Sequence, residues 1–186
     1  MDFEREQKQI VDTVKGERKE GIIRAWNKYN GDVACRIILG HIRSHLPKGY
    51  KVVGPNVYIE GIPNELDLLV VTDVAIPRDF TNAYSPDVVS CLIEVKASGY
   101  FNKSEPGKYR SLFEGFTQKF PHVRCIYLTI RERGKPKNPY SKNYAGDMKD
   151  ELEPKFRTFT LSDSRTGKPE IGQWKDFINY LQQSLS

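Results

Sequence analysis

Three charged residues lie inside two apolar runs of this sequence. Asp67 falls within NELDLLVV (residues 64–71), and Glu94 and Lys96 fall within VSCLIEVKAS (residues 89–98). Both runs are short, rich in Val, Ile and Leu, and bounded by Pro, Gly, Asn or Asp, which is typical of β-strands. Charges at such positions need partners or a function, because an unpaired buried charge is costly.

Strand geometry predicts that these charges meet. Successive side chains of a strand point to opposite faces. Glu94 and Lys96 therefore share one face with Ser90, Leu92 and Ser98, and the opposite face is wholly apolar: Val89, Cys91, Ile93, Val95 and Ala97. In the first run, Glu65 and Asp67 point the same way as Leu69. Two adjacent strands would thus gather two or three carboxylates and one lysine in front of a packed core.

That combination suits a hard divalent cation. Mg²⁺ prefers oxygen ligands, usually one or two carboxylates with waters and a substrate phosphate. Asp67 and Glu94 can supply the carboxylates, and Lys96 can orient a water or neutralise charge on a phosphate. The alternative is an ordinary strand on which Glu94 and Lys96 form a weak surface ion pair.

The order of these motifs resembles the PD-(D/E)XK nuclease superfamily, and the stretch from Gly31 to Lys96 is similar to one uncharacterised bacterial branch of it. The matching pieces are GDVACRIILGHIRSHLP, KVVGPNVYIEG, NELDLLVV and CLIEVKAS. The resemblance implies an α/β fold of the restriction-endonuclease-like kind, with three α/β/α layers around a central mixed sheet. Many members carry a metal-site glutamate on the first helix of the core, where this sequence offers Asp32.

The resemblance also implies roles for individual residues. Asp67 and Glu94 would bind Mg²⁺, with Mn²⁺ as a substitute, and the backbone carbonyl of Val95 would complete the metal site. Lys96 would assist catalysis, and Glu65 is a candidate for an extra acid. The implied function is metal-dependent hydrolysis of DNA, as an endonuclease of restriction, repair or recombination type. The alternative is a non-catalytic nucleic-acid-binding module on the same fold.

Composition is compatible with this assignment without requiring it. The 186 residues carry a formal net charge of +5 and a pI near 9.0, which suits an anionic partner such as DNA. We expect one nuclease-like domain over residues 1–186, comprising an N-terminal helical segment (1–30), an α/β core (31–161) and a C-terminal helix (172–185). The three cysteines lack metal-type spacing, which favours buried free thiols in the cytoplasm, and no run is long enough to span a membrane.

The pattern of apolar residues predicts the order of elements. Helices are expected over 2–29 in two pieces broken near Gly16 and Gly21, and over 32–46 after a turn at 29–32. Strands are expected at 50–59, 65–73, 88–97, 123–130 and 156–161, and further helices at 108–119 and 173–185. A helix between the third and fourth strands indicates that those two are parallel. On the helix at 108–119, Gln118 is a weak candidate for contact with a phosphate or a metal-bound water.

A basic segment follows the strand at 123–130. Residues 131–149 carry six Lys or Arg and two acidic residues, a net charge of +4. Basic residues with interleaved tyrosines suit contact with a nucleic-acid backbone and bases, although a merely solvated loop has the same composition. The predicted DNA contacts are Arg131, Arg133, Lys135, Lys137 and Lys142. Because one copy of such a nuclease cuts one strand, cleavage of both strands would require two copies, and a homodimer is the simplest arrangement.

Overall fold

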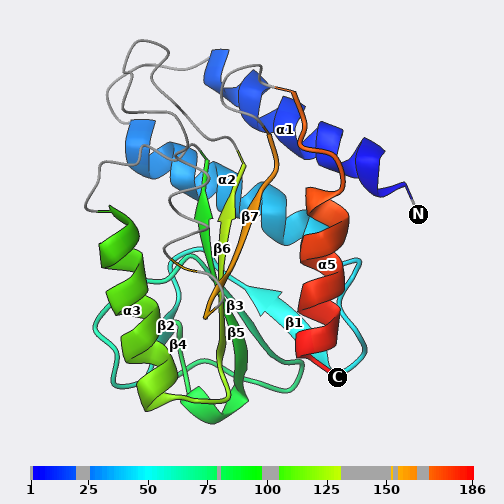
Figure 1. Ribbon diagram of the computed structural model, residues 1–186. Coiled ribbons are helices and arrows are strands. Elements are labelled where there is room, and N and C mark those ends of the chain that lie inside the picture. Colours follow the sequence, from blue (N-terminus) through cyan, green and yellow to red (C-terminus); the bar gives the residue numbers. More distant parts are fainter. Residues whose placement is uncertain are drawn as a thin grey trace.

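The computed structural model describes residues 2–19, 26–78, 81–97, 105–130, 152, 155–162 and 168–186 (Figure 1). The helices are α1 (Phe3–Lys19), α2 (Trp26–Ile42), the 3-10 turn η1 (Pro86–Val88), α3 (Glu105–Lys119) and α5 (Gln173–Ser184). The strands are β1 (Tyr50–Val53), β2 (Tyr58–Ile59), β3 (Leu68–Thr72), β4 (Ala83–Tyr84), β5 (Val89–Lys96), β6 (Arg124–Thr129) and β7 (Arg157–Thr160).

A five-stranded mixed sheet forms the centre of the molecule. Its strand order is β1-β3-β5-β6-β7, so β5 occupies the middle position. The first three strands pair antiparallel, whereas β5, β6 and β7 pair parallel, as the helix between β5 and β6 predicts. The short strands β2 and β4 form a separate parallel pair.

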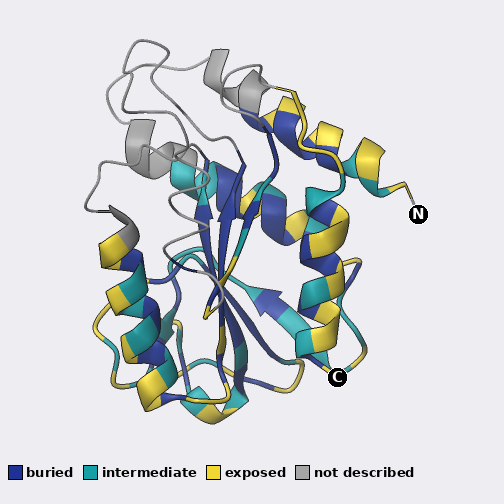
Figure 2. Cartoon of the chain, in the orientation of Figure 1, coloured by how far each residue is buried: buried dark blue, intermediate teal, exposed yellow. Residues whose placement is uncertain are grey.

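Helices cover both faces of this sheet, which gives three layers. On one face, α1, α2 and α5 pack over a cluster that includes Leu68, Cys91, Ile93 and Leu128. On the other face, α3 packs over a cluster that includes Leu69, Leu92 and Tyr127. Figure 2 shows the strands buried between the two helical layers. Because β5 is covered on both faces and paired on both edges, its backbone is the best-fixed part of the fold.

Local turn signals predict two boundaries incorrectly. The Tyr29–Asp32 segment was expected to be a turn, but α2 begins at Trp26 and runs through it. The buried stripe of Ala34, Ile38 and Ile42 continues this helix across the sheet, and packing outweighs the turn propensity of Asn30 and Gly31. Similarly, α1 runs through Gly16 without a break.

The strand expected over 50–59 is two strands. β1 ends at Val53, and β2 begins at Tyr58. Between them Gly54 and Asn56 have positive φ angles of 137° and 63°, and Pro55 has no N–H to donate to a ladder. The chain therefore leaves the main sheet at Gly54, and β3 takes the place next to β1.

One residue of β5 lies on the face opposite to the predicted one. Val89 packs with Leu92 in the cluster under α3, whereas Cys91, Ile93 and Val95 face the other layer as expected. The pairing of β3 with β5 shifts register between Val70 and Val71, so that Val70 opposes Cys91 and Val71 opposes Val89. Ser90 is then the extra residue of a β-bulge, which reverses the alternation before it.

The three cysteines match the prediction of buried free thiols. Cys35, Cys91 and Cys125 are all buried and form no disulfide. Burial raises the pKa of Cys91 and of Cys125 to about 12, so both remain protonated at neutral pH. Within the described part of the chain, none of the helices has the length and apolar character needed to cross a bilayer.

A hydrogen-bonded carboxylate ties α1 to α2. Glu6 on α1 pairs with His41 Nδ1 at 2.9 Å and with His45 Nε2 at 2.8 Å. Burial raises the pKa of Glu6, but the nearby Trp174 indole and the two imidazoles outweigh it, and the net pKa is lowered from its usual 4.5. The indole N–H meets no acceptor at hydrogen-bond geometry in the described residues, so the imidazoles supply the directed contacts. Glu6 thus fixes α1 against the helix that packs on β5.

We predict that Glu6→Gln destabilises the protein by about 1.5–3 kcal/mol at pH 7, the usual range for a hydrogen bond to a charged group. A carboxyl with a lowered folded-state pKa contributes stability above its unfolded pKa, and this contribution is lost as pH falls through the folded value. The gap in unfolding free energy between wild type and variant should therefore shrink below about pH 4.5. Denaturant titrations at pH 7 and pH 3.5 measure it, with the exposed Glu4→Gln as control; a gap independent of pH contradicts the assignment.

Candidate active site

The sheet register brings Asp67 and Glu94 face to face. Leu68 of β3 opposes Ile93 of β5, and continuing this antiparallel register by one residue places Asp67 opposite Glu94. Asp67 immediately precedes β3, and Glu94 is the third residue from the end of β5. The alternation that puts Leu69 and Leu92 under α3 puts Asp67, Glu94 and Lys96 on the same face. The convergence predicted from the sequence is therefore present in the structure.

Two backbone features hold Asp67 in this position. The Val95 N–H donates a hydrogen bond of 2.8 Å to Asp67 Oδ2, which ties the carboxylate to β5. On the other side, the backbone of Gly54 approaches so closely that a Cβ there would collide with the Asp67 carbonyl oxygen and the Leu68 side chain. Gly54 also has a φ of 137°, a value that other residues rarely adopt. Glycine at position 54 thus allows β1 to end where the site begins.

Lys96 connects the two carboxylates. Its ammonium donates a short hydrogen bond to Glu94 Oε1 and lies 3.7 Å from Asp67 Oδ2. The Lys96 Nζ also lies 5.5 Å from the ring centroid of Tyr109 on α3, within the range of a cation–π contact. Tyr109 in turn packs on Tyr127 of β6, with 5.0 Å between ring centroids. The half-buried lysine therefore contacts two acids and an aromatic ring.

Burial sets the electrostatics of this cluster. Desolvation raises the pKa of Asp67 above its usual value, although Lys96 and the Val95 N–H lower it in part. Desolvation likewise raises the pKa of Glu94, with Lys96 opposing and Asp67 reinforcing the shift. Desolvation alone would lower the pKa of Lys96, but Glu94 and Asp67 outweigh it and raise that pKa above its usual value. Lys96 is thus a fixed cation at neutral pH, and both carboxyls would gain from a further positive charge.

Two more charged groups act on the cluster. The charge of Asp32 on α2 raises the pKa of Asp67, and that of Lys108 on α3 lowers the pKa of Glu94. Asp32 occupies the position at which the sequence resemblance led us to expect a helix glutamate. In the part of the chain that the structure describes, however, no three His, Cys, Asp or Glu side chains are arranged as a metal-binding group. The described donor set is therefore the pair Asp67 and Glu94.

The remaining predicted residues lie at different distances from this cluster or outside the described part of the chain. The backbone of Val95 lies at the site through its bond to Asp67, while its side chain faces the opposite layer. Glu65 is exposed and accepts a hydrogen bond of 3.2 Å from the Tyr58 hydroxyl of β2. Gln118 is exposed near the far end of α3, whereas the α3 residues beside the site are Lys108 and Tyr109. The predicted DNA contacts from Arg131 to Lys142 lie outside the described residues.

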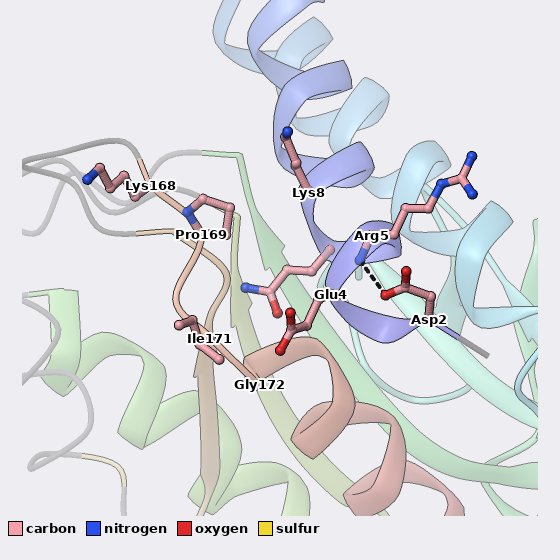
Figure 3. A pocket seen from close by; sticks show the side chains of 9 residues that line it. Asp2, Glu4, Arg5, Lys8, Lys168, Pro169, Ile171 and Gly172 are labelled. Carbon is pink, nitrogen blue, oxygen red and sulfur yellow. Dashed lines mark hydrogen bonds between the residues drawn. The ribbon is translucent and has the colours of Figure 1, made fainter.

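A cavity of about 540 Å³ lies elsewhere, between the start of α1 and the chain before α5 (Figure 3). Its lining mixes acidic and basic side chains, including Glu4, Arg5, Lys8 and Lys168. Gln7 also lines the cavity. Its side-chain amide donates hydrogen bonds to the carbonyls of Leu161 and Glu170 and accepts one from the backbone N–H of Trp174. These bonds satisfy the buried Gln7 amide, and among the described residues none of the predicted site residues lines the cavity.

Comparison with known proteins bears on the fold. No family model and no curated protein matches this chain. Among solved structures, NucC of P. aeruginosa ATCC27853 in its cAAA-bound form superposes with a TM-score of 0.66 at 13% identity, covering 98% of this chain and 90% of that one. This chain has the fold of NucC. The cAAA-bound NucC of E. coli MS115-1 gives 0.62 at 15% identity over 98% and 89% of the two chains, and its apo form gives 0.53 at 12% over 83% and 84%.

The likeness to NucC confirms the predicted fold class, a mixed sheet between helical layers of the restriction-endonuclease-like kind. At 12–15% identity it extends to the fold alone. The closer resemblance to one bacterial branch stays a prediction. The site residues consequently rest on their own geometry in this chain.

We predict that Asp67→Asn raises the melting temperature at pH 7 in EDTA. A carboxyl with a raised folded-state pKa binds a proton more readily in the folded protein, so its ionisation lowers stability as pH rises above the unfolded value of 3.8. The Asn amide oxygen can still accept the Val95 N–H. The gain should diminish toward pH 4, and Asp73→Asn, an exposed acid just beyond the other end of β3, should show none. A variant that melts below wild type at pH 7 would mean that the ionised carboxylate stabilises the fold.

Proposed function

We propose that this protein is a metal-dependent nuclease that hydrolyses DNA phosphodiester bonds, acting as an endonuclease. The observation that carries the proposal is the convergence of Asp67, Glu94 and Lys96 at the end of the central strand. The fold shared with NucC supports the proposal at the level of the backbone. The net charge of +5 suits a polyanionic substrate.

The donor set fits a divalent cation. Asp67 and Glu94 both lie within reach of one ammonium, so a cation between them could be shared by their two carboxylates. Oxygen donors of this kind favour Mg²⁺, with Mn²⁺ as a substitute, and the Val95 carbonyl is a further candidate ligand. Such a cation, when bound, polarises a phosphoryl oxygen and lowers the pKa of a coordinated water.

Each residue of the cluster then has a separate role. The Val95 N–H orients the Asp67 carboxylate, and Glu94 is fixed by its place on β5. Lys96, which stays protonated, supplies positive charge to the phosphate as negative charge develops on it, and therefore acts as an electrostatic group rather than as a base. Tyr109 contacts the lysine from the α3 side through its ring. Glu65 is retained as a candidate extra acid.

The alternative is a nucleic-acid-binding module that has the fold without catalysis. The two proposals differ in their requirement for the divalent ion, because a binding module would hold DNA equally well in EDTA. Cleavage of both strands by the nuclease would require two copies of the chain, so we also propose a homodimer. The form of the DNA product, nicked or linear, reports on this point directly.

We predict nicking or linearisation of supercoiled plasmid in Mg²⁺ or Mn²⁺ and no cleavage in EDTA. Glu94→Gln and Lys96→Ala should each lower the rate about a hundredfold or more, the usual cost of one preorganised charge at a phosphoryl centre. Glu114→Gln and Lys119→Ala on α3 serve as matched controls. Because two NucC structures contain cAAA, each reaction is run with and without it. Undiminished cleavage in EDTA would refute the metal requirement, and DNA binding without cleavage in every reaction would favour the binding module.

The basic segment is proposed to contact the DNA backbone through Arg131, Arg133, Lys135, Lys137 and Lys142. Its net charge of +4 nearly equals the +5 of the whole chain. Each phosphate neutralised on duplex DNA contributes about −0.9 to the slope of log affinity against log salt. We predict that Lys135→Glu with Lys137→Glu weakens binding to all sequences alike and flattens this slope by roughly two.

Fluorescence anisotropy on several duplexes measures this effect, with Lys8→Glu together with Lys168→Glu as a control of equal charge change. If the Lys135 and Lys137 variant keeps the wild-type affinity and slope, the segment is solvated surface. If the control weakens binding by the same amount, net charge rather than position is responsible.

A further inference from the structure

Thr129 lies beside Lys96 on the neighbouring strand. The two residues are paired in the parallel register of β5 and β6. Cys125 and Tyr127 of β6 face α3, so the alternation of the strand puts the Thr129 side chain on that same face, with Glu94 and Lys96. Adjacent strands are about 4.8 Å apart, which is well within the reach of a lysine side chain. Thr129 is therefore the nearest strand position to Lys96 on the side away from Asp67.

The hydroxyl of Thr129 is buried and unsatisfied. The residue is 1% exposed, and its Oγ1 has no hydrogen-bond partner among the described residues. Its backbone carbonyl, by contrast, has a partner, because the Leu161 N–H donates to it at 2.8 Å. Buried hydroxyls nearly always have a hydrogen-bond partner, so we expect a second arrangement of the site in which the Thr129 hydroxyl has one.

Lys96 is the neighbour of Thr129 whose present hydrogen-bond partners would be lost on binding of a cation. In this structure the ammonium lies with Glu94 and Asp67, the two carboxylates that the proposed function assigns to a divalent cation. A cation bound there would repel the Lys96 ammonium and would coordinate the carboxylate oxygens that the ammonium now contacts. The lysine then needs another acceptor on its own face of the sheet, and the Thr129 hydroxyl occupies the adjoining position.

We propose that Thr129 is a positioning residue that receives the Lys96 ammonium when the carboxylates are taken up by a cation. The catalytic role of this residue rests on the proposed function. The exchange of the Lys96 ammonium from the carboxylates to the Thr129 hydroxyl can be tested without that function. A hydroxyl is a neutral acceptor, so the ammonium bound to Thr129 keeps its positive charge uncompensated. That charge is then available to a phosphate, whereas the carboxylates neutralise it.

A double-mutant cycle tests the exchange without metal or DNA. Thr129→Val removes the hydroxyl at nearly constant shape, and Glu94→Met removes the close acceptor of Lys96. With Glu94 present, Thr129→Val should leave the melting temperature in EDTA unchanged or raise it, because an unsatisfied hydroxyl is lost. In the Glu94→Met background, Lys96 keeps only its longer carboxylate contact, with Asp67 Oδ2 at 3.7 Å, and gains from the Thr129 hydroxyl, so Thr129→Val should lower the melting temperature while Thr129→Ser does not. The same effect in both backgrounds would overturn the proposal.

A calorimetric titration with Mn²⁺ extends the test to the proposed site. Thr129→Val should weaken Mn²⁺ binding about tenfold or more, and Thr129→Ser should restore it, because the displaced ammonium regains its acceptor. Thr72→Val is the matched control: its hydroxyl is also buried without a partner among the described residues, but it lies at the opposite end of β3. Wild-type affinity in Thr129→Val would overturn the inference. Absence of Mn²⁺ binding in the wild type would refute the metal-dependent function alone, since the stability cycle reports on the exchange separately.

Discussion

The fold is built around a small group of charges held partly out of water. Asp67, Glu94 and Lys96 leave a net charge of −1 at the end of β5, where burial raises the pKa of both acids. Each carboxylate is tolerated there because Lys96 and the Val95 N–H offset part of its desolvation. The hydrogen bonds among these groups weaken steeply when their geometry is distorted, so the strands that carry them must be held in place.

The surrounding structure provides this fixation. β5 is the central strand, with β3 and β6 on its edges and an apolar cluster on each face. Gly54 lets the chain leave β1 without displacing Asp67, and Glu6 holds α1 to the helix that packs behind β5. Groups on strands that are packed from both sides keep their geometry better than groups on loops. The stable part of the molecule is thus also the part that positions the charges.

The sequence predicted what depends on local periodicity. The two-residue repeat of a strand was enough to place Glu94 with Lys96 and to orient Asp67 toward them. It failed at Val89, because the bulge at Ser90 depends on how β3 pairs with β5. It failed again at Asn30 and Gly31, where helix packing outweighs turn propensity. Tyr109 could have been found, since it lies three and four residues before Leu112 and Phe113 and extends their buried stripe by one turn.

The arrangement of charges also bears on the choice between an enzyme and a binding scaffold. A scaffold that only binds nucleic acid gains nothing from two desolvated carboxylates, which repel phosphate and cost stability in the absence of a cation. Natural proteins depart from such local rules mainly at functional sites. The likeness to NucC concerns the fold alone, so the proposal of a nuclease depends on where the side chains of Asp67, Glu94 and Lys96 lie.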